Sequence, residues 1–135
     1  MASKTIKQTE LIEGVKTTQV YDALLDPKTH AAFTGSAATG DPRVGGEFTA
    51  WDGYISGKHL ELDPPRRIVQ EWTTSEWPED APPSKIEWTF VQKDNGTEVT
   101  MVHSKVPESQ VESYRQGWID YYWGPLKKYF AKKSR

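Results

Sequence analysis

Histidine is the residue of this sequence best suited to metal binding or to acid–base chemistry near neutral pH, and the chain has three histidines and no cysteine. His30, His59 and His103 lie far apart in the sequence and lack the close ligand pair of zinc motifs. We therefore predict no metal site and no cofactor. By strict alternation, His103 shares a strand face with Val99 and Met101, so it is either a satisfied interior histidine or a residue that faces a cavity.

Catalytic motifs are also missing. Neither Gly45-Gly46 nor the turn at Gly40 is followed by the lysine and hydroxyl residue that bind phosphate at a helix start. No serine lies in the Gly-x-Ser-x-Gly pattern of a nucleophile elbow. The sequence therefore predicts a protein that is not an enzyme and has no catalytic residues.

Aromatic residues are the other conspicuous group, with six tryptophans, six tyrosines and four phenylalanines in 135 residues. A buried tryptophan contributes a large apolar area and one N–H that needs a partner. Such residues commonly fill a core, but they also line ligand pockets, and both interpretations stay open at this point. The residues expected on inner faces form the candidate ligand-binding set: Phe48, Trp72, Trp88, His103, Tyr114, Trp118 and Tyr122.

The first two thirds of the chain predict one strand, two short helices and then an antiparallel sheet. Asp26 is the expected cap of the second helix, with Pro27 at its first position and Gly35 at its end. Asp52-Gly53 predicts a two-residue hairpin, and Asp94-Asn95-Gly96 predicts another. The expected strands cover residues 5–13, 47–51, 54–63, 67–75, 85–92 and 97–105.

After Pro107 the spacing of apolar residues changes to three and four, which predicts a helix with one apolar face about five turns long. Pro125 lies inside this helix and should kink it, because proline has no backbone N–H and crowds the carbonyl of Tyr121. The order of elements predicts an α+β fold, in which a curved antiparallel sheet wraps around the long C-terminal helix as a single domain over residues 1–135. The expected helix face consists of Val111, Tyr114, Trp118, Tyr122, Leu126 and either Tyr129 or Phe130.

Composition excludes two classes of partner. Lysine and arginine number 17 and aspartate and glutamate number 19, so no overall field favours nucleic acid or a membrane surface. No apolar run approaches the roughly 20 residues that a membrane helix needs, and the polar start MASKTIKQTE lacks the apolar stretch of a signal peptide. We expect a cytoplasmic protein that contacts neither nucleic acid nor membrane.

Several motifs in order resemble the family of activators of the ninety-kilodalton heat-shock-protein ATPase, within the helix-grip superfamily of START-related and birch-pollen-allergen-like domains (SRPBCC). The resemblance implies a sheet that curls around the terminal helix and leaves a cavity. In the eukaryotic activators a similar domain is the C-terminal half of a larger co-chaperone, and this chain looks like that half alone. The motifs are residues 20–24 (VYDAL), 30–34 (HAAFT), 45–48 (GGEF), 51–57 (WDGYISG), 67–72 (RIVQEW), 75–78 (SEWP), 106–107 (VP), 116–118 (QGW) and 121–122 (YY).

The resemblance leads to three hypotheses about function. The leading one is a non-catalytic domain that holds a small hydrophobic molecule between sheet and terminal helix. The alternative is a co-chaperone module that contacts the heat-shock ATPase through Asp41, Arg43 and Trp77, although Trp77 is also suited to be a lid over one end of the core. A more distant third is an enzyme of the cyclase or hydrolase kind. A ligand pocket needs on the order of 300 Å³, whereas an interaction module can be packed solid.

Overall fold

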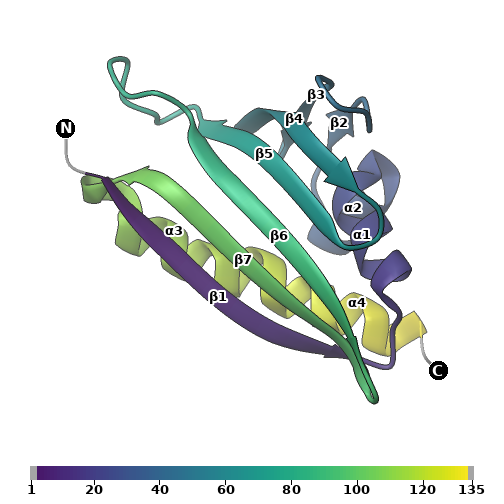
Figure 1. Cartoon of the computed structure of the whole chain (residues 1–135). Helices are drawn as coiled ribbons and strands as arrows, with labels where there is room; N and C mark the ends of the chain where they lie inside the picture. Colours follow the sequence, from purple (N-terminus) through teal and green to yellow (C-terminus); the bar gives the residue numbers. More distant parts are fainter. Residues whose placement is uncertain (1–2, 134–135) are drawn as a thin grey trace.

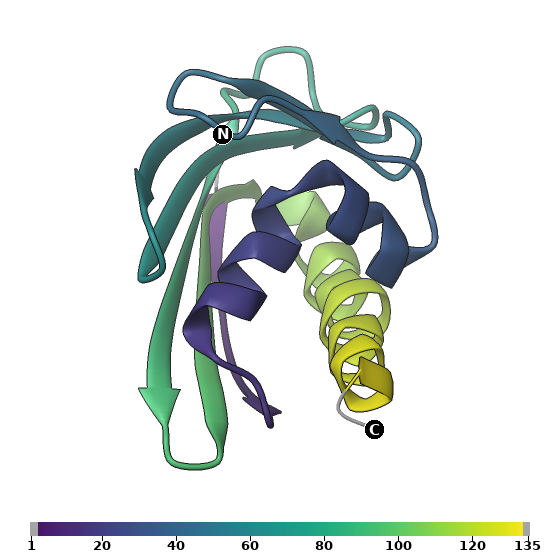
Figure 2. The same ribbon diagram turned by 90° about the vertical axis from the view of Figure 1, so that its right-hand side faces the viewer.

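A seven-stranded antiparallel sheet curves around the C-terminal helix (Figures 1 and 2), which confirms the predicted α+β helix-grip fold. The computed structural model describes residues 3–133. The spatial order of the strands is β1-β7-β6-β5-β4-β3-β2, so the first strand pairs with the last. The strands are β1 (Ser3–Glu13), β2 (Thr39–Gly40), β3 (Glu47–Ala50), β4 (Ile55–Asp63), β5 (Arg67–Thr74), β6 (Ser84–Lys93) and β7 (Gly96–Pro107).

Two short helices follow β1 and lie beside the C-terminal helix on the concave side of the sheet (Figure 2). The second of them begins as predicted: the Asp26 carboxylate accepts a hydrogen bond from the Thr29 N–H, and Pro27 occupies the first turn. It ends at Gly35, whose φ of 80° is the left-handed conformation that favours glycine. The helical elements are α1 (Thr17–Leu25), α2 (Pro27–Thr34), the 3₁₀ turn η1 (Glu108–Gln110), α3 (Val111–Trp118), the π turn η2 (Ile119–Trp123) and α4 (Gly124–Lys133).

The C-terminal helix is interrupted next to Pro125, as the sequence predicts, but the interruption takes the form of the π turn η2. The Gly124 N–H bonds the carbonyl of Ile119, five residues earlier. Pro125 has no N–H to donate to the carbonyl four residues before it, so the regular ladder is lost at this point. The wider turn buries the adjacent residues Tyr122 and Trp123, of which only Tyr122 belongs to the predicted face.

The connection between β3 and β4 differs from the prediction. Strand β3 ends at Ala50, which pairs with Ile55, so the turn has four residues instead of two. Trp51, Asp52 and Gly53 all have positive φ, at 53°, 57° and 90°. A left-handed conformation is uncommon for a bulky residue. It takes Trp51 out of the predicted strand and into the turn.

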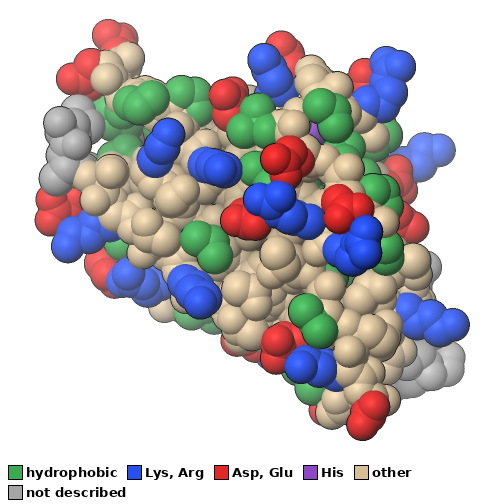
Figure 3. Space-filling model, in the orientation of Figure 1, with side chains coloured by type: hydrophobic (Ala, Val, Ile, Leu, Met, Phe, Trp, Pro, Cys, Tyr) green, Lys and Arg blue, Asp and Glu red, His purple; other side chains and the backbone are tan. Residues whose placement is uncertain are grey.

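The outer face of the sheet carries acidic and basic side chains mixed together, with hydrophobic side chains scattered between them (Figure 3). Arg67 is typical: its guanidinium bonds Glu87 at 2.6 Å and Glu61 at 2.5 Å. This solvated face contrasts with the inner face, where the core lies between sheet and helices. Apolar surface suited to a ligand therefore lies on the inner face and at its edges.

Candidate functional site

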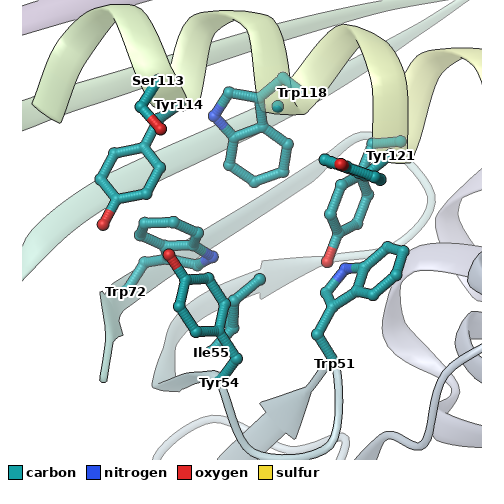
Figure 4. A pocket seen from close by; sticks show the side chains of 10 residues that line it. Trp51, Tyr54, Ile55, Trp72, Ser113, Tyr114, Trp118 and Tyr121 are labelled. Atoms are coloured by element: carbon teal, nitrogen blue, oxygen red, sulfur yellow. The ribbon is translucent and has the colours of Figure 1, made fainter. Parts of the chain in front are cut away.

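An open pocket of about 370 Å³ lies between the C-terminal helix and the β3–β4 turn (Figure 4). Tyr54 and Tyr121 are 36% and 57% exposed, which leaves this side of the pocket open to solvent. Almost all of its wall is aromatic. The helix contributes Ser113, Tyr114, Gly117, Trp118, Tyr121 and Tyr122, and the sheet side contributes Trp51, Tyr54, Ile55 and Trp72.

Gly117 leaves space on the helical side of the pocket, because glycine has no side chain. A Cβ atom added at this position would meet only the Tyr121 ring, at 3.9 Å, among the atoms outside its immediate backbone. Glycine inside a helix is less stable than alanine by about 0.5–1 kcal/mol, because it loses more backbone freedom on folding. The residue therefore costs helix stability and leaves open space where a side chain would otherwise project.

One end of the pocket carries a network of hydroxyl and amide hydrogen bonds. The Tyr54 hydroxyl donates to the Glu76 carboxylate at 2.5 Å. The Tyr114 hydroxyl donates to the Gln110 side chain at 2.6 Å and lies 2.7 Å from the Thr74 hydroxyl. Burial raises the pKa of both tyrosines, and the bond to Glu76 raises that of Tyr54 further. Both phenols are therefore protonated at neutral pH.

The floor of the pocket is fixed from below by His103, which is fully buried. The Ser84 hydroxyl donates to the Trp72 carbonyl at 2.6 Å, so it accepts from Nε2–H of His103 at 2.8 Å. The Trp118 indole N–H donates to Nδ1 of His103 at 3.1 Å. Burial lowers the pKa of His103 to about 3, which keeps the ring neutral. Nδ1 of His103 thus holds the Trp118 side chain, while Nε2 ties the imidazole ring to Ser84.

A second cavity, of about 30 Å³, lies deeper beneath the sheet. Phe48 and Trp88 line it, and Trp72, Trp118 and Tyr122 line both cavities. Phe48 stacks on the His59 ring with centroids 5.0 Å apart, whereas Trp88 donates its indole N–H to Gln70 at 3.2 Å. A space of this size holds about one water molecule and no organic ligand. The centre of the sheet–helix interface is therefore nearly filled, and the room for a ligand lies at its edge.

The predicted ligand-binding set is consequently divided by the structure. Trp72, Tyr114, Trp118 and Tyr122 line the large pocket. Phe48, Trp88 and His103 do not line it, so any part they have in ligand binding is indirect and stays a prediction.

The prediction missed residues from both walls. Gly117 and Tyr121 follow Tyr114 and Trp118 by three residues, so the helical period contains the signal that places them on the same stripe. Trp51 and Tyr54 carried no such signal, because their place depends on the four-residue turn. The full set that sequence reasoning missed is Trp51, Tyr54, Ile55, Ser113, Gly117 and Tyr121.

Tyr122 joins the pocket to α2. Its hydroxyl lies 3.0 Å from Nε2 of His30. Burial lowers the pKa of His30 to about 4 and raises that of Tyr122, so the pair is neutral. Among the described residues, Nδ1 of His30 has no hydrogen-bond partner. The contact holds Tyr122 against α2, at the inner end of the pocket wall.

Trp77 packs against the pocket from outside. Its ring stacks on Tyr114, with centroids 6.2 Å apart and planes at 22°, and meets Trp72 edge-on at 6.1 Å. Its indole N–H donates to the Pro82 carbonyl at 3.0 Å. These contacts suit the lid interpretation of Trp77; they do not test its contact with a partner.

Asp41 and Arg43, the other candidate partner-binding residues, form an exposed pair joined by two hydrogen bonds of 2.8 Å. The bond from Arg43 lowers the pKa of the Asp41 carboxyl. Figure 1 shows the β2–β3 segment well separated from the β5–β6 segment that carries Trp77. The predicted partner-binding residues therefore lie in two different places on the surface.

Residues 3–133 also bear on metal binding and on membrane insertion. Within this range, no three histidine, cysteine or acidic side chains are placed to hold a metal ion together. None of the helices in the same range has the length and apolar character needed to cross a membrane. The pocket itself is built from aromatic rings, a few hydroxyls and one isoleucine.

Comparison with known proteins agrees with the motifs and with the fold. The model of the family described as Activator of Hsp90 ATPase homolog 1-like protein matches residues 15–131. The chain belongs to this family. The match contains the β3–β4 turn and the pocket-lining part of the C-terminal helix, so the pocket lies within the family domain.

The curated relatives are longer than this chain. The human activator of 90 kDa heat shock protein ATPase homolog 1 is 33% identical over 97% of this chain, which corresponds to 38% of that protein. The Dictyostelium discoideum homologue is 28% identical over 98% of the chain and 34% of its own length. The chain thus spans less than two fifths of these curated relatives.

Several solved structures have nearly the same extent as this chain. One of them, an HSP90 activator from Plasmodium falciparum, superposes with a TM-score of 0.83 at 25% identity, covering 96% of each chain.

Proposed function

We propose that this protein is a non-catalytic binding domain that holds a small apolar molecule in the pocket between the C-terminal helix and the β3–β4 turn. The observation that carries the proposal is the pocket itself, whose volume of about 370 Å³ exceeds the roughly 300 Å³ that small-molecule sites need. Its aromatic walls offer apolar surface, and the hydroxyls at one end can orient a ligand.

The rigidity of the walls supports binding. Trp118 is fixed by its bond to His103, and Tyr114 is fixed by Thr74 and Gln110. Side chains that are already ordered lose little further freedom when a ligand arrives, which favours affinity. The pocket is therefore formed before binding.

The protonation of the groups around the pocket supports a non-catalytic role. General acid–base catalysis is most efficient when the pKa of the catalytic group lies near the working pH. Burial moves the pKa of Tyr54, Tyr114 and Tyr122 upward and that of His103 downward, in each case away from neutrality. The arrangement favours binding over proton transfer.

A neutral fluorescent probe, N-phenyl-1-naphthylamine, tests this proposal. We expect its emission to rise on titration with the protein and its addition to raise the melting temperature. A Gly117→Leu variant should abolish the signal, because the new side chain projects into the pocket. The matched Gly117→Ala variant should keep it and be more stable by about 0.5–1 kcal/mol. Absence of binding by the unmodified protein, or undiminished binding by the leucine variant, would contradict the proposal.

The co-chaperone function is the second candidate, and the activator from Plasmodium falciparum favours it, because that chain has nearly the same extent. The test is the ATP hydrolysis rate of purified ninety-kilodalton heat-shock protein with and without added protein. An increase that saturates with concentration is expected. No change in rate together with no measurable complex would rule this function out for the chain.

A further inference from the structure

We infer that the pocket selects an organic cation, a small molecule with an alkylated ammonium group, over its neutral and anionic counterparts. The inference rests on the proposed function, because it concerns the ligand class of the same pocket. It follows from three observations: the faces of the lining rings, the charges that surround them and the position of Glu76.

The lining offers aromatic faces and no formal charge. Among the described residues, none of those that line the pocket carries a charged side chain at neutral pH. The face of an aromatic ring bears partial negative charge and attracts a cation within about 6 Å of its centre. A carboxylate placed there would lose its hydration and gain no cationic partner, which is unfavourable. The wall itself therefore discriminates in favour of positive charge.

Rings from opposite sides of the pocket approach one another closely. The centroid of the Trp72 ring, on the sheet, lies 5.2 Å from that of Tyr114 and 5.5 Å from that of Trp118, both on the helix. At the other end of the pocket, the ring centroids of Trp51 and Tyr121 lie 5.4 Å apart. Figure 4 shows these side chains arranged around the open space of the pocket. Within each group the rings contact each other directly, so they are held in place at the edges of the pocket, and an ammonium group in the open space borders rings from both groups.

Glu76 supplies a full negative charge at the hydroxyl-lined end. Its carboxylate accepts the hydrogen bond from Tyr54, which lines the pocket. A carboxylate that polarises a lining phenol lowers the energy of a cation nearby and raises that of an anion. The end of the pocket that can form hydrogen bonds is thus also its most negative end.

The charges next to the lining residues in sequence reinforce this sign. Asp52 follows Trp51 directly, and Asp120 precedes Tyr121. The basic residue in a comparable place, Arg115, forms an ion pair with Glu112 on the same helix. The residues next to the lining residues in sequence therefore carry more negative than positive charge, although the whole chain has a net charge of only −2.

The test compares three molecules of similar size by displacement of N-phenyl-1-naphthylamine. Benzyltrimethylammonium is the cation, neopentylbenzene is its neutral isostere, and phenylacetate is an anion. We expect the cation to bind at least about tenfold more tightly than the neutral isostere, within the range of a desolvated cation–π contact. Phenylacetate should bind most weakly.

The outcomes separate this inference from the proposed function. Equal or tighter binding of neopentylbenzene overturns the cation preference and leaves a neutral apolar site. Tighter binding of phenylacetate than of benzyltrimethylammonium overturns the preference for positive charge. Failure of the naphthylamine probe and of all three molecules to bind overturns the proposed function, and the inference with it.

A Glu76→Gln variant tests the part assigned to the carboxylate, and it retains an acceptor for the Tyr54 hydroxyl. We expect the affinity for benzyltrimethylammonium to fall about twofold to fivefold, since an opposite charge near the surface is worth roughly that much. The affinity for neopentylbenzene should not change. Equal losses for both molecules, or no loss for the cation, would overturn the role of Glu76.

Discussion

The two sides of the C-terminal helix are both aromatic, yet one is closed and the other open. On the closed side, the Trp123 indole donates to Gln8 of β1 at 2.6 Å and packs edge-on to Trp88 at 5.9 Å. The Gln8 amide in turn donates to the carbonyl of Arg115 at 3.0 Å. On the open side, Tyr121 is 57% exposed and lies beside the pocket.

The difference lies in the strands that face each side. Strands β1, β6 and β7 have 11, 10 and 12 residues, whereas β3 has four and β2 has two. Long strands cover the helix along its length. Strand β3 ends at Ala50, and in the turn that follows the Trp51 ring packs edge-on to Tyr121 and Tyr122 of the helix. Aromatic composition alone does not distinguish core from pocket; the reach of the opposing strand does.

The largest expected effect comes from removing a ring of the closed side. Trp123→Ala should destabilise the protein by about 3–5 kcal/mol, because it removes a buried side chain and leaves the Gln8 side chain without its indole partner. Tyr121→Ala, on the same helix but exposed, should cost about 1 kcal/mol or less. Chemical denaturation of both variants measures this. Similar losses for the two would mean that the sides do not differ as the structure indicates.

Acidification should weaken the closed interior through His30 and His103. Burial lowers their pKa to about 4 and about 3, below the ordinary value of 6.5. Between about pH 6.5 and pH 4 the unfolded chain binds protons that the folded chain does not, so stability falls as the pH falls. The slope is about 1.4 kcal/mol per pH unit for each histidine.

Equilibrium denaturation at pH 7, 6 and 5 measures this slope. A His30→Phe variant should lose part of the histidine contribution, and the remainder comes from His103 and from His59, whose pKa is also lowered by burial. A free energy of unfolding that is the same at pH 7 and pH 5 would show that neither histidine is neutral and buried as described.

Sequence reasoning succeeded where local pattern decides structure. The cap at Asp26, the end of α2 at Gly35, the alternating strands and the helical stripe from Val111 onward depend on residues a few positions apart. The family motifs also lie in such segments. The α+β fold was therefore predictable in the order of its elements, apart from the short strand β2, whereas the pairing of β1 with β7 was not predicted.

The pocket was predictable only in part, because its walls meet through tertiary contacts. The stripe of Tyr114, Trp118 and Tyr122 follows from helix period alone. The place of Trp51 depends on a four-residue turn with left-handed backbone, and nothing in Asp52-Gly53 distinguishes that turn from a two-residue one. The near-filling of the space around Trp88 depends on packing distances, which a sequence pattern does not contain.

A smaller effect is expected at Trp77, which lies at the boundary of the open side. Trp77→Ala should destabilise the protein by about 1–3 kcal/mol, because the ring stacks on Tyr114 and meets Trp72. Affinity for the heat-shock ATPase should stay the same if Trp77 is a lid. An unchanged melting temperature with an affinity loss of about 2 kcal/mol or more would instead make it an anchor for the chaperone.

The smallest effect on stability is expected at Arg43, which lies on the loop between β2 and β3 and belongs to neither side of the C-terminal helix. Its ion pair with Asp41 is exposed, and such pairs contribute little because water and salt screen them. Arg43→Ala should therefore leave the melting temperature and the binding of N-phenyl-1-naphthylamine unchanged. Arg66→Ala is the matched control, because Arg66 forms a similarly exposed pair with Asp63 outside the candidate loop. If the β2–β3 loop contacts the heat-shock ATPase, only the Arg43 variant should bind it more weakly. Equal affinities for the two variants and the unmodified protein would remove this loop from the candidate contact surface and leave the pocket as the separate site.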